Sequence, residues 1–518
     1  MIRPEAPERP GLPAPSYSES AHEPARSEPY ERYTLDRYHT SIRRLAANKR
    51  WYAGITIATV VFAGLVFSQV HYPRTAVGHA LQWLTIVWLL PVPLIALSVA
   101  VYYLWFRADR FTIEWPSRLP TPTHRPTVNF QVTSTGVNVE TVLHTVGSIV
   151  HWTRQHPEIC YDPVVWLVVE EWGIGSNQPR FDALQADGVR VVVTPVAYRT
   201  PKGTTRKGRS LHLAVEERRK LGIPLDRLWV YHHDDETAIG EDTVLGIDEF
   251  LRRHAAEKAL GMGIILYPQH GEDLRPSQVQ EFNRTKDDLR TIFTVTSHHN
   301  MFSGFHGSHY LVRADVEDET GWDVGPDMSS EDLIFENLVR RQHGPIAHLL
   351  KGFAYEQAAF NLRDQLKQRR RWFQGWWRAV FQQPFSAPRR FVMTYSMMVW
   401  MAAVLSVSTM ILSWIFDFSA PYFFAGALAG FVWSSMIIGY HTGYTLHLEY
   451  LPPRRVPLPR VVVNGIVGAL LDGVAPWYGV LTRCPKAFQV ISKDSPSARP
   501  APRLPQGAAT APAPPSAA

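Results

Sequence analysis

The chain has little cysteine: Cys160 and Cys484 are the only two among 518 residues. They lie far apart and share no spacing typical of metal ligands, which argues against a disulfide framework and against a zinc site, and suits a reducing compartment. The sequence also lacks a strong charge of either sign, because a net charge of +6 is small for this length. Nucleic acid is therefore not indicated as a partner.

Both ends of the chain lack any regular apolar pattern. Residues 1–34 are rich in Pro, Glu and Ser, and residues 494–518 are mostly Pro and Ala. Such segments cannot bury enough apolar surface to form a core, so both tails are predicted to be disordered.

Long apolar runs occur instead between the two tails, in separate blocks. Two blocks within residues 51–106 and two within 391–444 are long enough to span a bilayer, and Arg and Lys residues flank them on one side. This predicts a multi-pass membrane protein in contact with lipids, with its catalytic domain and both termini cytoplasmic, in the plasma membrane if the protein is bacterial. Residues 461–481 contain Asp472 and Pro476, and are predicted to form a broken, re-entrant or interfacial segment, with a fifth crossing as the alternative.

The middle of the chain, residues 117–365, has the mixed composition of a globular domain. Short runs of β-forming residues alternate there with helical stretches, which predicts an α/β domain with a Rossmann-like, mostly parallel sheet. The clearest predicted strands are Thr127–Val132, Val164–Val169, Val189–Val193 and Arg227–His232. Ligands of such sheets bind beyond the carboxyl ends of the strands.

Three acids follow the fourth predicted strand, in the order Asp234, Asp235 and Glu236. Oxygen ligands at this density suit Mg²⁺ or Mn²⁺ carrying a diphosphate, whose leaving charge the metal neutralises. The alternative is a set of acids at a helix N-terminus, which the helix dipole favours without any metal.

A second acidic pair, Glu331 and Asp332, follows Ser329 and Ser330 and opens a predicted helix. Asp332 would suit a general base that takes a proton from an attacking hydroxyl group. Serine before acids is also an ordinary helix start, so capping is the alternative explanation.

Residues 200–213 contain Lys207 and Arg209 among glycines, ahead of a predicted helix. Such a loop can bind phosphate oxygens, although it lacks the spacing of a Walker loop, and a solvated basic turn is the alternative. Farther along, residues 366–385 combine Arg and Lys with Phe and Trp at helical spacing. They are predicted to form an amphipathic helix on the cytoplasmic membrane surface, which would bind anionic lipid even without a catalytic role.

Together and in this order, the strand-end acids, the Glu331-Asp332 pair and Gln368-x-x-Arg371-Trp372 before an apolar block resemble the membrane-bound family 2 glycosyltransferases. Within them the sequence is similar to the egghead-type β-1,4-mannosyltransferases. The resemblance covers about residues 120–390. It implies a GT-A-type domain joined to transmembrane helices, with Mg²⁺ or Mn²⁺ as cofactor.

The resemblance also implies a reaction: inverting transfer of mannose from GDP-mannose to a glucosyl lipid, forming a β-1,4 linkage with Asp332 as general base. Glu236 and Asp234 would bind the metal. The implied donor-binding residues are Glu170, Lys207, Arg209, Asp234, Asp235, Gln368, Arg371 and Trp372. The implied acceptor-binding residues are Trp372, Glu331, His306 and Ser308.

Two other functions fit the same pattern. A processive polysaccharide synthase would use a UDP-sugar and would need a channel through the membrane. A non-catalytic membrane scaffold or transporter would use the acids and the basic helix for binding only, although the apolar blocks carry few ionisable residues to line a pathway.

Overall fold

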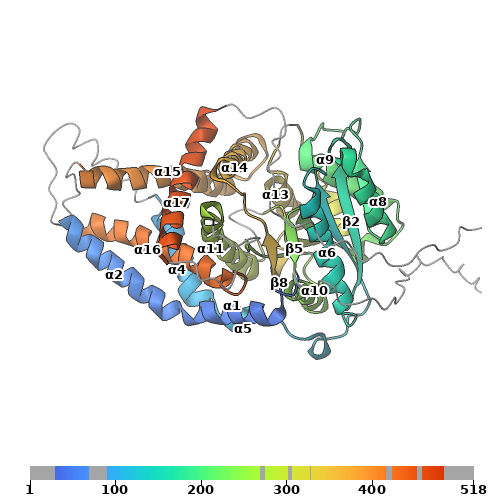
Figure 1. Cartoon of the computed structure of the whole chain (residues 1–518), viewed down its shortest axis with the longest axis horizontal. Helices are drawn as coiled ribbons and strands as arrows, with labels where there is room; N and C mark the ends of the chain where they lie inside the picture. Colours follow the sequence, from blue (N-terminus) through green and yellow to red (C-terminus); the bar gives the residue numbers. More distant parts are fainter. Residues whose placement is uncertain are drawn as a thin grey trace, which may run out of the picture.

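The computed structural model describes residues 30–68, 90–268, 275–300, 306–326, 328–415, 423–451 and 458–482. A sheet with its covering helices lies beside a group of long helices (Figure 1). The predicted disordered tails lie outside the described residues except for residues 30–34, as does the part of the second apolar block before residue 90.

The strands form one mixed sheet in the order β3-β2-β1-β4-β7-β6-β8-β5. They are β1 Thr127–Ser134, β2 Asp162–Glu170, β3 Arg190–Thr194, β4 Leu228–Asp234, β5 Thr237–Ile239, β6 Leu260–Leu266, β7 Tyr310–Arg313 and β8 Ala347–Glu356. Strands β3, β2, β1 and β4 are parallel and are the four predicted ones. In the other half, β7 is antiparallel to both β4 and β6, and β5 is antiparallel to β8. Strands β6 and β8 pair in parallel, so four of the seven pairs among the described strands are parallel and the sheet is mixed but, as predicted, mostly parallel.

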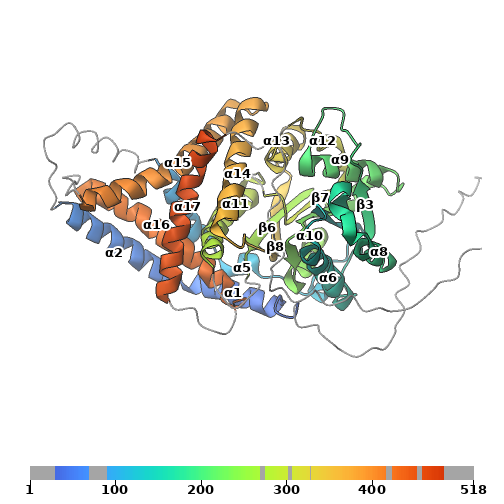
Figure 2. The same cartoon turned by 45° about the horizontal axis from the view of Figure 1, so that its top comes forward.

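The helices form two sets. Those associated with the sheet domain are α6 Val139–Gln155, α7 Glu171–Ile174, α8 Gln178–Ala186, α9 Arg206–Arg219, α10 Glu241–Arg253, α12 Ala314–Thr320 and α13 Glu331–His343. The others are α1 Leu35–Ala47, α2 Lys49–Ser68, α4 Val92–Ala100, α5 Ala108–Phe111, α11 Pro276–His298, α14 Leu362–Gln382, α15 Ala387–Ile415, α16 Phe423–His447 and α17 Leu458–Leu481. Helix α11 joins the two sets, because it packs on β6 and β8 as well as on α16 and α17 (Figure 2).

Helix α17 is continuous from Leu458 to Leu481 although Pro476 lies inside it, so the predicted break in this segment is wrong. It packs on α14 and α15, which stabilise a helix that has lost one backbone hydrogen bond to proline. None of the helices in the described ranges meets the length and hydropathy that a membrane span requires.

Helix α14 contains the predicted amphipathic segment, and two of its basic side chains lie inside the protein. Arg369 and Arg370 are buried, and Arg369 forms ion pairs with Glu281 of α11 at 2.7 Å and Asp472 of α17 at 3.3 Å. Acids distant in sequence thus neutralise the charge of Arg369 inside the protein, so this side chain is not part of a surface that binds anionic lipid.

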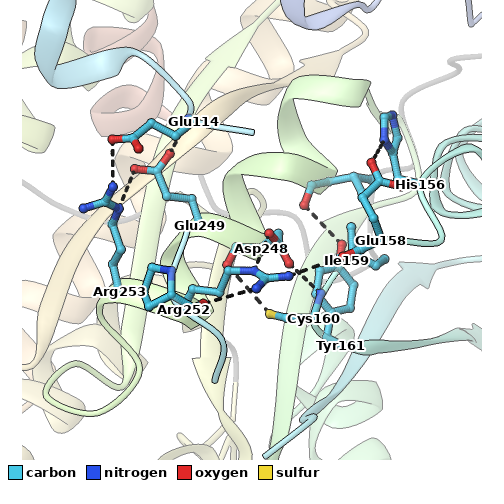
Figure 3. Close-up of polar contacts among 12 residues, drawn as sticks. Glu114, His156, Glu158, Ile159, Cys160, Tyr161, Asp248, Glu249, Arg252 and Arg253 are labelled. Atoms are coloured by element: carbon cyan, nitrogen blue, oxygen red, sulfur yellow. Dashed lines mark hydrogen bonds and ion pairs between the residues drawn. The ribbon is translucent and has the colours of Figure 1, made fainter. Parts of the chain in front are cut away.

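Helix α10 holds the sheet to the segments before β1 and β2 through its acids. Asp248 accepts a hydrogen bond from the Cys160 backbone N–H at 2.5 Å and pairs with Arg252 at 2.8 Å (Figure 3). Cys160 is buried and free, and Cys484 lies outside the described residues. Burial raises the pKa of the Cys160 thiol, with the Asp248 charge adding to the effect. This thiol is therefore part of the core and not a nucleophile.

A buried carboxylate, Glu317 of α12, fixes β4 relative to α13. It pairs with Arg218 of α9 at 2.5 Å, lies 3.0 Å from His232 of β4, and accepts a hydrogen bond from the Trp322 indole at 2.6 Å. Trp322 stacks on Phe335 of α13 at a centroid distance of 4.0 Å. Burial acts to raise the pKa of Glu317, but Arg218 and His232 lower it to about 2.

We expect Glu317→Ala to lower the free energy of unfolding by about 3–5 kcal/mol, because it leaves the Arg218 guanidinium buried without its partner. Asp318→Ala is the matched control: its partner Arg219 is half exposed, so the loss should stay below about 1 kcal/mol. Denaturant unfolding followed by tryptophan fluorescence measures both. Equal losses for the two variants would contradict a special role for Glu317.

Candidate active site

The acids after β4 have different surroundings. Asp235 is buried and accepts a hydrogen bond from the Ser134 hydroxyl at 2.7 Å, while its backbone carbonyl accepts one from Thr145 at 2.8 Å. Burial, followed by the charge of Glu236, raises the pKa of Asp235 well above its usual value. Asp235 therefore holds the ends of β1 and β4 together, while Asp234 and Glu236 are only partly buried.

Lys207 brings the basic loop to the strand-end acids. Its ammonium group contacts the Asp234 carboxylate and donates a hydrogen bond to the Gly307 carbonyl at 2.7 Å. Burial acts to lower the pKa of Lys207, but Asp234, Glu331 and Asp332 raise it above its usual value. The lysine is therefore a fixed cation within a group of acids.

Gly307 lies at the point where three charged side chains meet. An ideal Cβ atom on it would lie 3.1 Å from Lys207 Nζ, 3.5 Å from Asp332 Oδ2 and 3.7 Å from Asp234 Oδ2. The end of β4 and the starts of α9 and α13 thus meet around a residue without a side chain. The space left open is next to both the predicted base and the predicted metal ligand.

Asp332 is in the first turn of α13, where its carboxylate accepts a hydrogen bond from the Leu333 N–H at 2.8 Å. Burial and the adjacent Glu331 raise the pKa of Asp332 to about 7, although Leu333 and Lys207 act to lower it. Among the described residues, the Ser330 side chain makes no capping hydrogen bond, so capping does not explain this acidic pair. A carboxylate with this pKa is suited to general base catalysis near neutral pH.

Glu170 and Arg209 form a closed pair on the same side of the sheet. The Glu170 carboxylate contacts the Arg209 guanidinium and accepts a hydrogen bond from Ser210 at 2.7 Å. Both residues line the cavity described below, and their charged groups already pair with each other. Their predicted donor contacts would therefore come from a preformed ion pair.

Asp323 fixes the loop that carries Lys207, a role that the sequence did not reveal. Its carboxylate accepts hydrogen bonds at 2.7 Å from the hydroxyl groups of Thr200 and Thr204 and from the Lys202 N–H. The loop is thereby attached to the segment that leads into α13. Two distant stretches of sequence are positioned as one unit.

Helix α14 comes close to the start of α13 because of Gly375. A Cβ atom there would lie 2.3 Å from Ser330 Oγ and 2.7 Å from Ser329 Oγ, so only glycine permits this approach. The helix begins at the Asn361 side chain, which accepts a hydrogen bond from the Asp364 N–H at 2.8 Å. The close approach at Gly375 brings the α14 residues Gln368, Arg371 and Trp372 to the same cavity as Asp332.

Trp372 is held by cations. The guanidinium carbon of Arg369 lies 4.4 Å from its ring centroid, and that of Arg284 lies 4.6 Å from it. Cation–π contacts of this kind fix the orientation of an indole ring. The result is a rigid aromatic surface, as expected of a platform for a sugar.

The predicted acceptor residues His306 and Ser308 differ in their placement. His306 lines the cavity, and burial lowers its pKa to about 3, so the ring is neutral. Ser308 is buried, does not line the cavity, and donates a hydrogen bond to Glu356 at 2.8 Å. Glu356, at the end of β8, also lines the cavity. It was not predicted from the sequence, although an acid at a strand end is the signal that identified Asp234.

Metal binding at Asp234 and Glu236 fits the chemistry of the site. Among the described residues, no three His, Cys, Asp or Glu side chains form a ready-made metal group. Mg²⁺ is commonly held by one or two carboxylates together with substrate phosphates, so two acids are sufficient. Burial and, after it, the charges of neighbouring acids raise the pKa values of Asp332 and Glu356. A divalent cation would compensate this local excess of negative charge.

One cavity of 1610 Å³ joins these elements. It contains all the predicted site residues except Ser308, together with residues of α4, α11, α15, α16 and α17. Pockets for single small ligands are roughly 300–1,000 Å³. The volume is therefore sufficient for a donor and an acceptor at the same time.

Comparisons with known proteins match parts of this chain. The family model described as glycosyl transferase family group 2 matches residues 229–437. The chain is 27% identical over 213 residues to the β-1,4-mannosyltransferase bre-3 of Caenorhabditis briggsae, covering 41% of this chain and 46% of that protein. It is 25% identical over 312 residues to the β-1,4-mannosyltransferase egh of Drosophila melanogaster, covering 59% and 67%. The match thus spans about half the length of the nematode relative.

Among solved structures, the mannosyltransferase PcManGT from Pyrobaculum calidifontis, in complex with GDP-Man and Mn²⁺, is 14% identical, covers 76% of this chain and 99% of that one, and has a TM-score of 0.42. Residues 229–437 therefore match the glycosyl transferase family group 2, in a chain that is similar to β-1,4-mannosyltransferases.

Proposed function

We propose that the protein transfers mannose from GDP-mannose to a lipid-linked sugar, with inversion, to form a β-1,4 linkage. The observation that carries the proposal is the convergence of Lys207, Asp234 and Asp332 on Gly307, inside a cavity that also contains Trp372. The β-1,4-mannosyltransferase relatives support the choice of sugar and linkage.

In the proposed reaction, Asp332 accepts the proton of the acceptor hydroxyl group while its oxygen forms a bond to the anomeric carbon. The bond from that carbon to the diphosphate breaks, and the electron pair leaves with GDP. A divalent cation held by Asp234 and Glu236 would neutralise the diphosphate. Lys207 and Arg371 add fixed positive charge beside it, which stabilises the leaving group where its charge develops. One displacement inverts the anomeric centre.

Contact with lipid is part of the proposal. Several large apolar side chains on the long helices are more than half exposed, including Trp51, Phe62 and Phe391. Such exposure is unfavourable in water and supports a surface covered by lipid. Together with the flanking Arg and Lys residues, it supports an integral membrane protein with a cytoplasmic catalytic domain.

The donor and product are tested with the purified full chain in lipid nanodiscs containing a glucosyl lipid. We expect one hexose to be added from GDP-mannose in the presence of Mn²⁺ or Mg²⁺, with activity lost on chelation, as measured by mass and linkage analysis of the lipid. Transfer only from a UDP-sugar would contradict the mannosyl assignment. A ladder of products would indicate a polysaccharide synthase, and nucleotide binding without transfer would indicate a non-catalytic protein.

We expect Asp332→Asn to lower kcat by about 10²–10⁴-fold, because the amide cannot accept the proton. GDP binding, measured by calorimetry, should persist, since the donor contacts remain. The matched control is Asp364→Asn on α14, because this acid pairs with Lys367 at the start of the helix and does not line the cavity. A wild-type kcat in Asp332→Asn would remove Asp332 from the mechanism.

The raised pKa of Asp332 predicts a pH dependence. The carboxylate is deprotonated above its pKa of about 7, so kcat should rise through this pH and fall below it. Glu331→Gln removes the neighbouring charge that raises this pKa, so its acidic limb should move to lower pH. An unchanged limb in that variant would show that another group controls the profile.

Gly307→Ala should reduce transfer at least about tenfold, because its methyl group enters the space between Lys207, Asp332 and Asp234. The control is Gly465→Ala on α17, where a Cβ atom meets nothing closer than 3.8 Å. Activity assays with a thermal unfolding measurement separate loss of chemistry from loss of fold. Equal activity in the two variants would contradict the placement of the reacting groups beside Gly307.

A further inference from the structure

The cavity also extends to the long helices, where its lining includes apolar side chains as well as the acid Asp472. Its wall there is contributed by α4, α16 and α17. The wall residues on which this inference rests are Ile95, Val432, Met436, Ile466, Ala469 and Leu470. We call the part of the cavity that these six residues line the apolar arm.

The helices around the apolar arm share one partner, α11, and differ in their others. Helix α16 packs mainly on α2 and α11, whereas α17 packs on α14, α15 and α11. Ile437 of α16 and Ile466 of α17 line the cavity and have 48% and 57% of their surface exposed. Apolar side chains that are accessible inside a cavity favour an apolar occupant over water.

The polar end of the cavity meets the apolar arm at α14. Trp372 and Trp376 line the cavity on one helix, four residues apart and thus on one face. A ligand with a sugar beside Trp372 would therefore have its remaining part among the long helices that line the same cavity. Only a molecule with a polar head and an apolar tail matches both ends.

We propose that the apolar arm binds the hydrocarbon chain of the acceptor, so that the lipid enters the protein and is not merely approached at a membrane surface. The inference rests on the proposed function for the identity of the head group as a sugar. The chain site itself depends only on the cavity and its wall. Ala469 is the residue where an added side chain would fill the apolar arm, because it is small and half-buried on α17.

The first test uses alkyl β-glucosides with 6, 8 and 10 carbons as acceptors, below their micellar concentrations. For the unaltered chain, KM should fall by up to about fourfold for each methylene. Ala469→Phe should largely abolish this dependence, whereas Val474→Phe should keep it, since Val474 is on the same helix, is 42% exposed and does not line the cavity. A normal chain-length dependence in Ala469→Phe would overturn the proposal.

The second test needs no turnover and therefore separates this inference from the proposed function. An alkyl glucoside with a diazirine at the end of its chain is photolysed with the full chain, and labelled peptides are identified by mass spectrometry. Labels in α4, α16 and α17 that Ala469→Phe suppresses would support the apolar arm even if no mannose is transferred. Labels confined to exposed outer residues such as Phe62 would overturn it, even if transfer is observed.

Discussion

The cation of Lys207 is the group on which the arrangement of the site depends. It contacts Asp234 and binds the Gly307 carbonyl, and its charge acts to lower the pKa of Asp332. Without it, the acids from β4 and α13 would repel one another in a buried place. The Lys207 side chain thus determines how a loop, a strand and a helix meet. Asp323 in turn fixes the loop that carries Lys207.

The predictable part of this protein was the part with local signals. The parallel strands are short β-branched runs, and the acids follow β4 and open α13 directly, so their positions could be inferred from the sequence. Strand β6 contains two glycines and β7 has only four residues, which hid these two strands and the antiparallel pairs that β7 forms. Glu356 and Asp323 act through contacts across more than a hundred residues, and no local pattern reveals such partners.

Helix α14 shows why the basic motif was misread in one respect. Periodicity alone assigned Arg369 to a lipid surface, but Glu281 and Asp472 supply its countercharge inside the protein. The ion pairs connect α14 to both α11 and α17, and Gly375 places the same helix against α13. Trp372, which is on this helix, is therefore held from the long helices as well as from the sheet domain.

The unbroken helix α11 fixes how the two parts of the cavity lie relative to each other. It lines the cavity from Gln280 to Thr291 and packs on both the sheet and the long helices, so it acts as a rigid spacer between them. A displacement of the long helices would therefore be transmitted through α11 to the sheet whose strand ends carry the acids.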